Sequence, residues 1–64
     1  MPEIVIYALS GRSADQKRAL VKDMTDAMVK NYGVPVDSVV VTIVETAASD
    51  KGKGGVLFSE MPRR

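Results

Sequence analysis

The sequence predicts an α+β fold, a β-α-β unit with two parallel strands followed by a short C-terminal hairpin. Residues 2–9 (PEIVIYAL) and 39–44 (VVVTIV) are apolar, β-branched runs, which are typical of strands covered on both faces. A long amphipathic segment separates them, and strands joined by a helix pair in parallel through a right-handed crossover. With 64 residues, the chain has room for one domain, residues 1–64.

The separating segment is expected to be a helix from about residue 14 to about residue 32. Ser13 with Gln16 three residues later is a capping-box pattern, and Gly33 is a typical C-terminal stop. Its charged side chains, including Lys17, are expected mostly on the solvent side. The apolar stripe that should face the sheet consists of Leu20, Val21, Met24, Ala27 and Met28.

Beyond Glu45 the composition becomes small, polar and glycine-rich (TAASDKGKGG), which predicts a loop or a loose hairpin, and the short apolar piece 56–58 follows. A two-stranded sheet with one helix leaves one sheet face bare, although both strands read as buried on two faces. We therefore expect a second chain to cover that face.

Composition limits both the sources of stability and the available chemistry. The chain has no cysteine and no histidine, which excludes disulfides, thiolate metal sites, thiol nucleophiles and imidazole bases, so no metal is expected. A domain of this size buries only about 60% of the surface that its unfolded chain exposes, and a homo-oligomer is therefore expected. Acid–base work falls to carboxylates, lysines, tyrosines or the chain terminus.

Charge and hydropathy indicate few kinds of partner. The net charge is +1 with both signs interspersed, and the aromatic residues are two tyrosines and one phenylalanine, so no nucleic-acid surface is visible. No stretch approaches the roughly 20 apolar residues of a membrane span, and we expect no signal peptide before the domain. A cytoplasmic protein without nucleic-acid or membrane partners is therefore expected.

An ordered set of residues, spread over nearly the whole chain, resembles the 4-oxalocrotonate tautomerase family. The set comprises Met1-Pro2, Gly11-Arg12-Ser13, Asp15-Gln16-Lys17, Pro35, Glu45 and Gly54-Gly55. The resemblance implies the same β-α-β fold assembled as a hexamer, a trimer of dimers, with some heterohexameric members. It also implies an isomerase without a cofactor, which interconverts enol and keto forms of small unsaturated 2-oxo carboxylic acids, as in aromatic degradation.

The resemblance assigns the catalytic base to Pro2 after removal of Met1, and initiator methionine is commonly removed before proline. A peptide-bonded proline nitrogen is an amide without basicity, whereas an N-terminal proline is a secondary amine. An α-amino group titrates near about pH 8, and burial or a nearby cation lowers its pKa toward a useful range for a base. The alternative is an ordinary proline at the start of a strand.

Arg12 matches the family arginine that binds a substrate carboxylate. Independently of the resemblance, it lies just before a helix N-terminus, where free backbone donors favour an anion. Its guanidinium can also bind a carboxylate through paired hydrogen bonds. The alternative is a solvated surface arginine.

Two positions depart from the family. Its second arginine corresponds to Val40, which offers no donor to the 2-oxo acid end of a substrate, and its pocket aromatic corresponds to Lys51. Lys51 is either a substrate-binding cation at the mouth of the pocket or a solvated loop lysine. Tyr7 and Tyr32 are further candidate proton donors, with partial burial as the alternative.

The leading interpretation is therefore a tautomerase with Pro2 as general base and Arg12 as carboxylate anchor. One alternative is a hydratase or dehalogenase of a small unsaturated acid. Another is a subunit of a heterohexamer, in which a different chain supplies the arginine that Val40 lacks. The third is a non-catalytic member that kept the fold and lost the chemistry.

Overall fold

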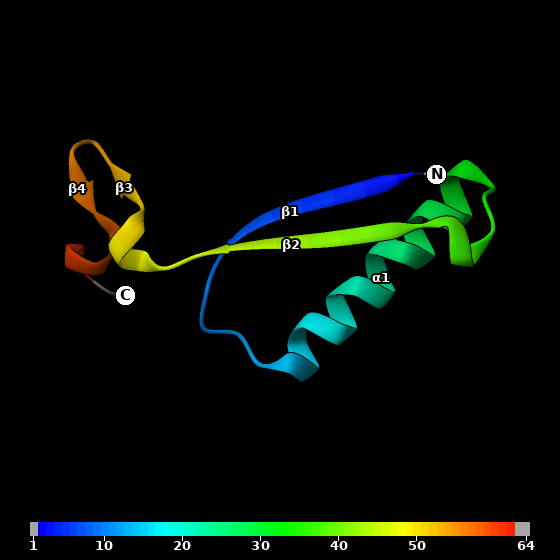
Figure 1. Ribbon diagram of the computed structural model, residues 1–64, viewed down its shortest axis with the longest axis horizontal. Coiled ribbons are helices and arrows are strands. Elements are labelled where there is room, and N and C mark those ends of the chain that lie inside the picture. Colours follow the sequence, from blue (N-terminus) through cyan, green and yellow to red (C-terminus); the bar gives the residue numbers. More distant parts are fainter. Residues whose placement is uncertain (1, 63–64) are drawn as a thin grey trace.

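The computed structural model describes residues 2–62 and consists of a two-stranded parallel sheet, one long helix and a small hairpin (Figure 1). Strand β1 spans Glu3–Leu9 and strand β2 spans Val40–Thr46. Their register runs from Glu3 opposite Val40 to Leu9 opposite Thr46. The predicted β-α-β unit with parallel strands is confirmed; Met1, whose removal is expected, lies outside the described residues.

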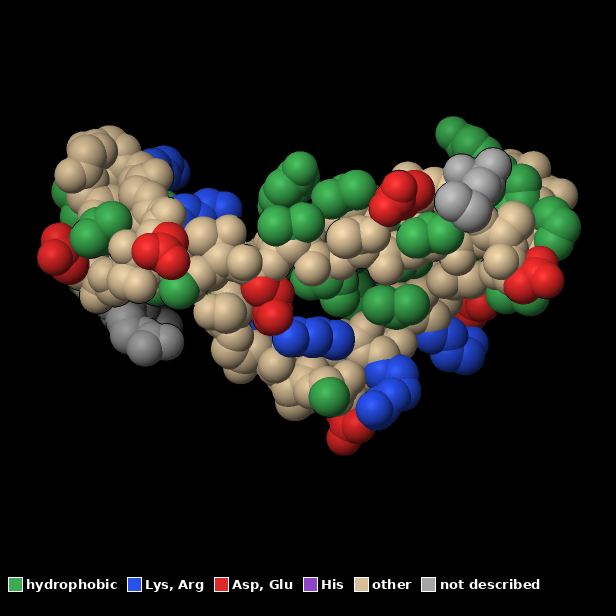
Figure 2. Space-filling model, viewed as in Figure 1, with side chains coloured by type: hydrophobic (Ala, Val, Ile, Leu, Met, Phe, Trp, Pro, Cys, Tyr) green, Lys and Arg blue, Asp and Glu red, His purple; other side chains and the backbone are tan. Residues whose placement is uncertain are grey.

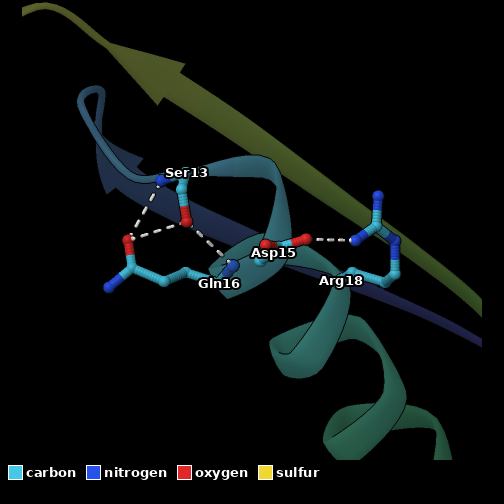
Figure 3. Close-up of polar contacts among 4 residues, drawn as sticks. All are labelled: Ser13, Asp15, Gln16 and Arg18. Carbon is cyan, nitrogen blue, oxygen red and sulfur yellow. Dashed lines mark hydrogen bonds and ion pairs between the residues drawn. The ribbon is translucent and has the colours of Figure 1, made fainter.

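Helix α1 spans Ala14–Tyr32 and makes the crossover between the strands. It begins with the predicted capping box, in which the backbone N–H of Gln16 donates to Ser13 Oγ at 3.1 Å and the Ser13 N–H donates to Gln16 Oε1 at 3.0 Å (Figure 3). It ends at Gly33, whose φ of 69° allows its N–H to reach the Val29 carbonyl at 3.0 Å. Local sequence signals therefore determine both helix ends.

The sheet has two unlike faces. On β1, Ile4, Ile6 and Ala8 are half-buried on the side of α1, while the alternating residues are exposed. The helix contributes half-buried apolar residues to the same layer, and here Ala27 departs from the prediction because it is exposed. The half-buried apolar residues of α1 are Leu20, Val21, Met24, Met28 and Val29.

The other sheet face is apolar, and no element within residues 2–62 covers it. Tyr7 is 74% exposed, Val5 46%, and Leu9 and Val44 38% each. Figure 2 shows hydrophobic side chains gathered along the side of the strands that points away from α1. No residue between 2 and 62 is fully buried, so this part of the chain has no interior of its own.

The C-terminal segment forms the expected hairpin. Strand β3 (Gly52–Lys53) pairs antiparallel with β4 (Val56–Leu57) through the two-residue turn Gly54-Gly55. Both turn residues have positive φ, 61° and 84°, the conformation that matches the twist of a tight hairpin. The hairpin stands apart from α1, beyond the end of β2 (Figure 1).

Residues 2–62 contain neither a membrane-spanning helix nor a cluster of metal-binding side chains. The only long helix there, α1, is not apolar enough to cross a membrane. Within the same range, no group of acidic side chains is arranged so that it could hold a metal ion.

Candidate active site

Arg12 lies in a short loop that is fixed at both ends. On one side, the Ser10 N–H donates to the Thr46 carbonyl at 3.0 Å and ties the end of β1 to β2. On the other side, Ser13 begins the capped helix. Between them, Gly11 has a φ of 116°, a conformation that L side chains rarely adopt. The sequence therefore defines the path of this loop closely, while the Arg12 side chain stays exposed.

Arg12 borders a cavity of about 260 Å³ between the start of α1 and the end of the sheet. Half-buried apolar side chains and charged side chains both contribute to its walls. The lining residues are Ala8, Leu9, Arg12, Gln16, Lys17, Leu20, Ile43 and Glu45. A guanidinium next to an apolar surface can bind a carboxylate while the remainder of the ligand contacts hydrocarbon.

Glu45, whose role the sequence left open, forms an ion pair with Lys17 in this cavity. Lys17 Nζ lies 2.7 Å from Glu45 Oε1, and the two side chains are 35% and 31% exposed. The expectation that Lys17 faces solvent is therefore wrong. Lys17 lies three residues before Leu20, which puts both side chains on one helix face, and this spacing could have placed it correctly.

Two further ion pairs lie on the solvent side of α1, within the helix itself: Arg18 with Asp15 (Figure 3) and Lys22 with Asp26. Lys22 Nζ lies 2.8 Å from Asp26 Oδ2, and the side chains are 75% and 58% exposed. The hydrogen bond to Asp26, and secondly the negative charge of Asp26, raise the pKa of the Lys22 ammonium above its usual value. Exposed pairs of this kind contribute little to stability.

Pro2 lies at the opposite end of the sheet from Arg12. It is half-buried, and its carbonyl accepts a hydrogen bond from the Val40 N–H at 3.0 Å. The seven residues of β1 separate it from the Arg12 loop, a span of about 23 Å at ~3.3 Å per residue. One chain therefore does not bring Pro2 and Arg12 together, while Val40 is a direct neighbour of Pro2.

The surroundings of Val40 contain a carboxylate. Glu3 is its partner in the register, and Glu3 Oε2 accepts a hydrogen bond from Thr42 Oγ1 at 2.8 Å. Glu3, Val40 and Thr42 lie on the uncovered sheet face, because paired residues of parallel strands share a face. This corner of the chain combines an apolar side chain with a negative charge.

Lys51 lies in the hairpin, at the Arg12 end of the sheet, but does not line the cavity beside Arg12. Its Nζ lies 5.9 Å from the ring centroid of Phe58, within reach of a cation–π interaction. The Phe58 N–H donates to the Lys51 carbonyl at 2.7 Å, so the two residues face each other across the hairpin. Lys51 is half-buried and is not a freely solvated loop lysine.

Phe58 is a pocket residue that the sequence reasoning missed. It lines a second cavity of about 340 Å³. The two-residue turn at Gly54-Gly55 could have predicted that Phe58 lies opposite Lys51, because turn length determines the hairpin register. The cavity is lined by Leu9, Ala48, Phe58, Ser59, Met61 and Pro62. Leu9, at the end of β1, borders both cavities.

Comparison with known proteins identifies the family. Residues 2–61 match the family model described as a tautomerase enzyme, and the chain belongs to this family. A probable tautomerase from Bradyrhizobium diazoefficiens is 45% identical over 60 residues, covering 94% of this chain and 90% of that protein. A 2-hydroxymuconate tautomerase from Pseudomonas putida is 38% identical over 63 residues, covering 98% of this chain and all of that protein.

Solved structures agree with the fold. The crystal structure of a 4-oxalocrotonate tautomerase homologue has a TM-score of 0.90 and 32% identity, covering 98% of this chain and 100% of that one. A chain of the heterohexamer 4-oxalocrotonate tautomerase from Chloroflexus aurantiacus has a TM-score of 0.87 and 29% identity, covering 97% and 100%. The predicted resemblance to this family is thus confirmed.

Proposed function

We propose that this protein is a cofactor-independent tautomerase, an isomerase that interconverts the enol and keto forms of a small unsaturated 2-oxo carboxylic acid. Pro2, as the N-terminal residue after removal of Met1, is the general base, and Arg12 binds the substrate carboxylate. The observation that carries the proposal is the fixed Arg12 loop beside an amphipathic cavity, in a chain that matches the tautomerase model from Pro2 onward.

The chemistry needs only a base that returns the proton it takes. The amine of Pro2 accepts the proton of the enol hydroxyl, the electrons move through the conjugated system, and the resulting ammonium protonates a carbon of the substrate. The secondary amine ends the cycle unchanged, so no oxidant, reductant or cofactor takes part. Arg12 holds the substrate carboxylate so that the carbon to be protonated lies next to the amine. Substrate binding thereby orients the reacting groups.

The proposed site is shared between subunits, because Pro2 and Arg12 of one chain lie at opposite ends of β1. Strand β1 pairs with β2 along one edge, and no strand within residues 2–62 pairs with its second edge. A two-fold axis that joins two such edges makes the strands antiparallel, and the start of one β1 then meets the end of the other. Pro2 of one subunit thereby reaches the Arg12 loop of its partner.

A second candidate is a subunit of a heterohexamer. The presence of Val40 favours it, because Val40 neighbours Pro2 and offers no donor to a substrate. The similarity to a chain of a heterohexamer from Chloroflexus aurantiacus also favours it. In that case a different chain provides the missing cation, and the pure chain by itself has little activity.

The chain is expected to form an oligomer, most simply a hexamer. The uncovered face that contains Val5, Tyr7, Leu9 and Val44, together with the lack of any fully buried residue in 2–62, leaves a lone chain without a core. Sedimentation at micromolar concentration should give a single oligomeric species. A stable, folded monomer under these conditions would contradict the expectation.

Substitution of the two proposed site residues should separate their roles. Pro2→Ala should lower kcat at least about tenfold, because a primary amine is a differently placed base. Arg12→Ala should raise KM more than it lowers kcat, because it removes a binding contact. Ketonisation of 2-hydroxymuconate and of phenylpyruvate enol by the Met1-free protein provides the assay, and unchanged kinetics in both variants would eliminate this site.

Lys51 is proposed to lie at the mouth of a neighbouring subunit's site. A cation near the Pro2 amine disfavours its protonation and so lowers its pKa. Lys51→Gln should therefore raise the acidic-limb pKa of kcat/KM, and added salt should shrink the difference from the wild type. Lys53→Gln, in the same hairpin, is the matched control and should leave the profile unchanged. If the pH profiles of the wild type and Lys51→Gln coincide at low salt, Lys51 does not affect the pKa of the Pro2 amine, and its contact with Phe58 is its only role in this account.

A further inference from the structure

We propose that Lys17 and Glu45 are positioning residues for Arg12, which together determine where its guanidinium meets the substrate carboxylate. This inference rests on the proposed role of Arg12 as the carboxylate anchor and extends it to two residues that act through Arg12. The pair connects the first turn of α1 to the end of β2 through the 2.7 Å contact between Lys17 Nζ and Glu45 Oε1. Both side chains line the cavity that Arg12 borders.

The pair lies where the helix has least other support. In Figure 1 the first turn of α1 lies farther from β2 than its later turns, and the cavity occupies the space between them. At this end Leu20 is the first half-buried apolar residue of the helix, about two turns after the Ser13 cap. The contact between Lys17 and Glu45 therefore bridges the opening and holds the first turn at a set distance from the sheet.

The position of this first turn determines the position of Arg12. The loop that carries Arg12 is tied to β2 at Ser10 and ends at Ser13, the cap of α1. If the helix start shifts relative to β2, one end of the loop shifts with it, and Arg12 is the residue next to that end. A displacement of about 1 Å in a positioning group can reduce the rate on the order of a hundredfold.

The Lys17–Glu45 pair is more buried than the other two ion pairs. Its side chains are 35% and 31% exposed, whereas those of Lys22 and Asp26 are 75% and 58% exposed and belong to one helix face. Solvent and salt weaken the attraction within an exposed pair and affect a partly buried one less. The exposed pair is thus a matched control, since it joins a lysine to a carboxylate within α1 and does not connect α1 to the sheet.

The test measures KM and kcat of the Met1-free oligomer, with 2-hydroxymuconate or phenylpyruvate enol, whichever the wild type converts faster. Glu45→Gln and Lys17→Met should each raise KM about tenfold with a smaller change in kcat. Lys17→Arg should keep most of the wild-type KM, because it can still bind Glu45. Lys22→Met should leave KM unchanged. Sedimentation of each variant restricts the comparison to intact oligomers.

The same substitutions in the Arg12→Ala background distinguish positioning from a general loss of structure. If the pair acts through Arg12, Glu45→Gln adds nothing to the effect of Arg12→Ala, because coupled residues are not additive. If Glu45→Gln changes KM by the same factor with and without Arg12, the positioning role is wrong. It is also wrong if Arg12→Ala raises KM and Glu45→Gln leaves it unchanged. An unchanged KM in Arg12→Ala would overturn the anchor role itself, and the positioning role with it.

Discussion

The structure depends on one constraint: a two-stranded sheet with a single helix can cover only one of its faces. Helix α1 lies over Ile4, Ile6 and Ala8, and the opposite face keeps Val5 and Tyr7 exposed. Apolar surface of this kind is stabilised by contact with another protein surface. Because the described part of the chain has only two strands in this sheet, each strand has one edge without a partner among residues 2–62. The hairpin lies away from the helix (Figure 1). This exposed apolar face is the basis for proposing that the chain works as part of an oligomer.

This constraint also explains where the candidate site residues lie. A straight strand separates its two ends by the full length of the sheet, so groups at the start and the end of β1 do not meet within one chain. Pro2 and Val40 mark one end, and the Arg12 loop with its cavity marks the other. In the proposed function, assembly therefore contributes to chemistry as well as to stability, because it joins the proposed base of one subunit to the proposed carboxylate anchor of another.

Much of the fold could be predicted because its signals are local. The Ser13–Gln16 capping box and Gly33 defined the helix, and the β-branched runs defined both strands. Where the structure differs from the prediction, the cause is a contact between distant parts of the sequence. The charge of Lys17 predicts a solvent-facing side chain, although the residue lies next to the apolar stripe. In the structure, Glu45, which is 28 residues away in the sequence, holds Lys17 against the sheet. A single sequence does not encode such a partner in any local pattern.

The candidate site was predictable to a similar degree. Arg12 and Pro2 were predicted as site residues from the family resemblance, with the place of Arg12 before a helix N-terminus as added support, and both remain predictions. Their separation could have been deduced from the strand between them, since β1 is extended. Phe58 was missed because an isolated aromatic residue carries no signal until the hairpin register puts it opposite Lys51. Local chemistry was thus visible in the sequence, and the relative placement of groups required the structure.

The central claim is that each active site combines Pro2 of one subunit with Arg12 of another, and subunit complementation tests it most directly. The Pro2→Ala and Arg12→Ala chains are produced separately and also co-expressed in equal amounts, and the tautomerase activity of the mixed oligomer is compared with that of each variant. With random mixing, about a quarter of the shared sites receive an intact Pro2 and an intact Arg12, so activity should rise to about that fraction of the wild type. Mixed oligomers that are no more active than the average of the two variants would contradict the account, because a site contained in one chain cannot be repaired in this way.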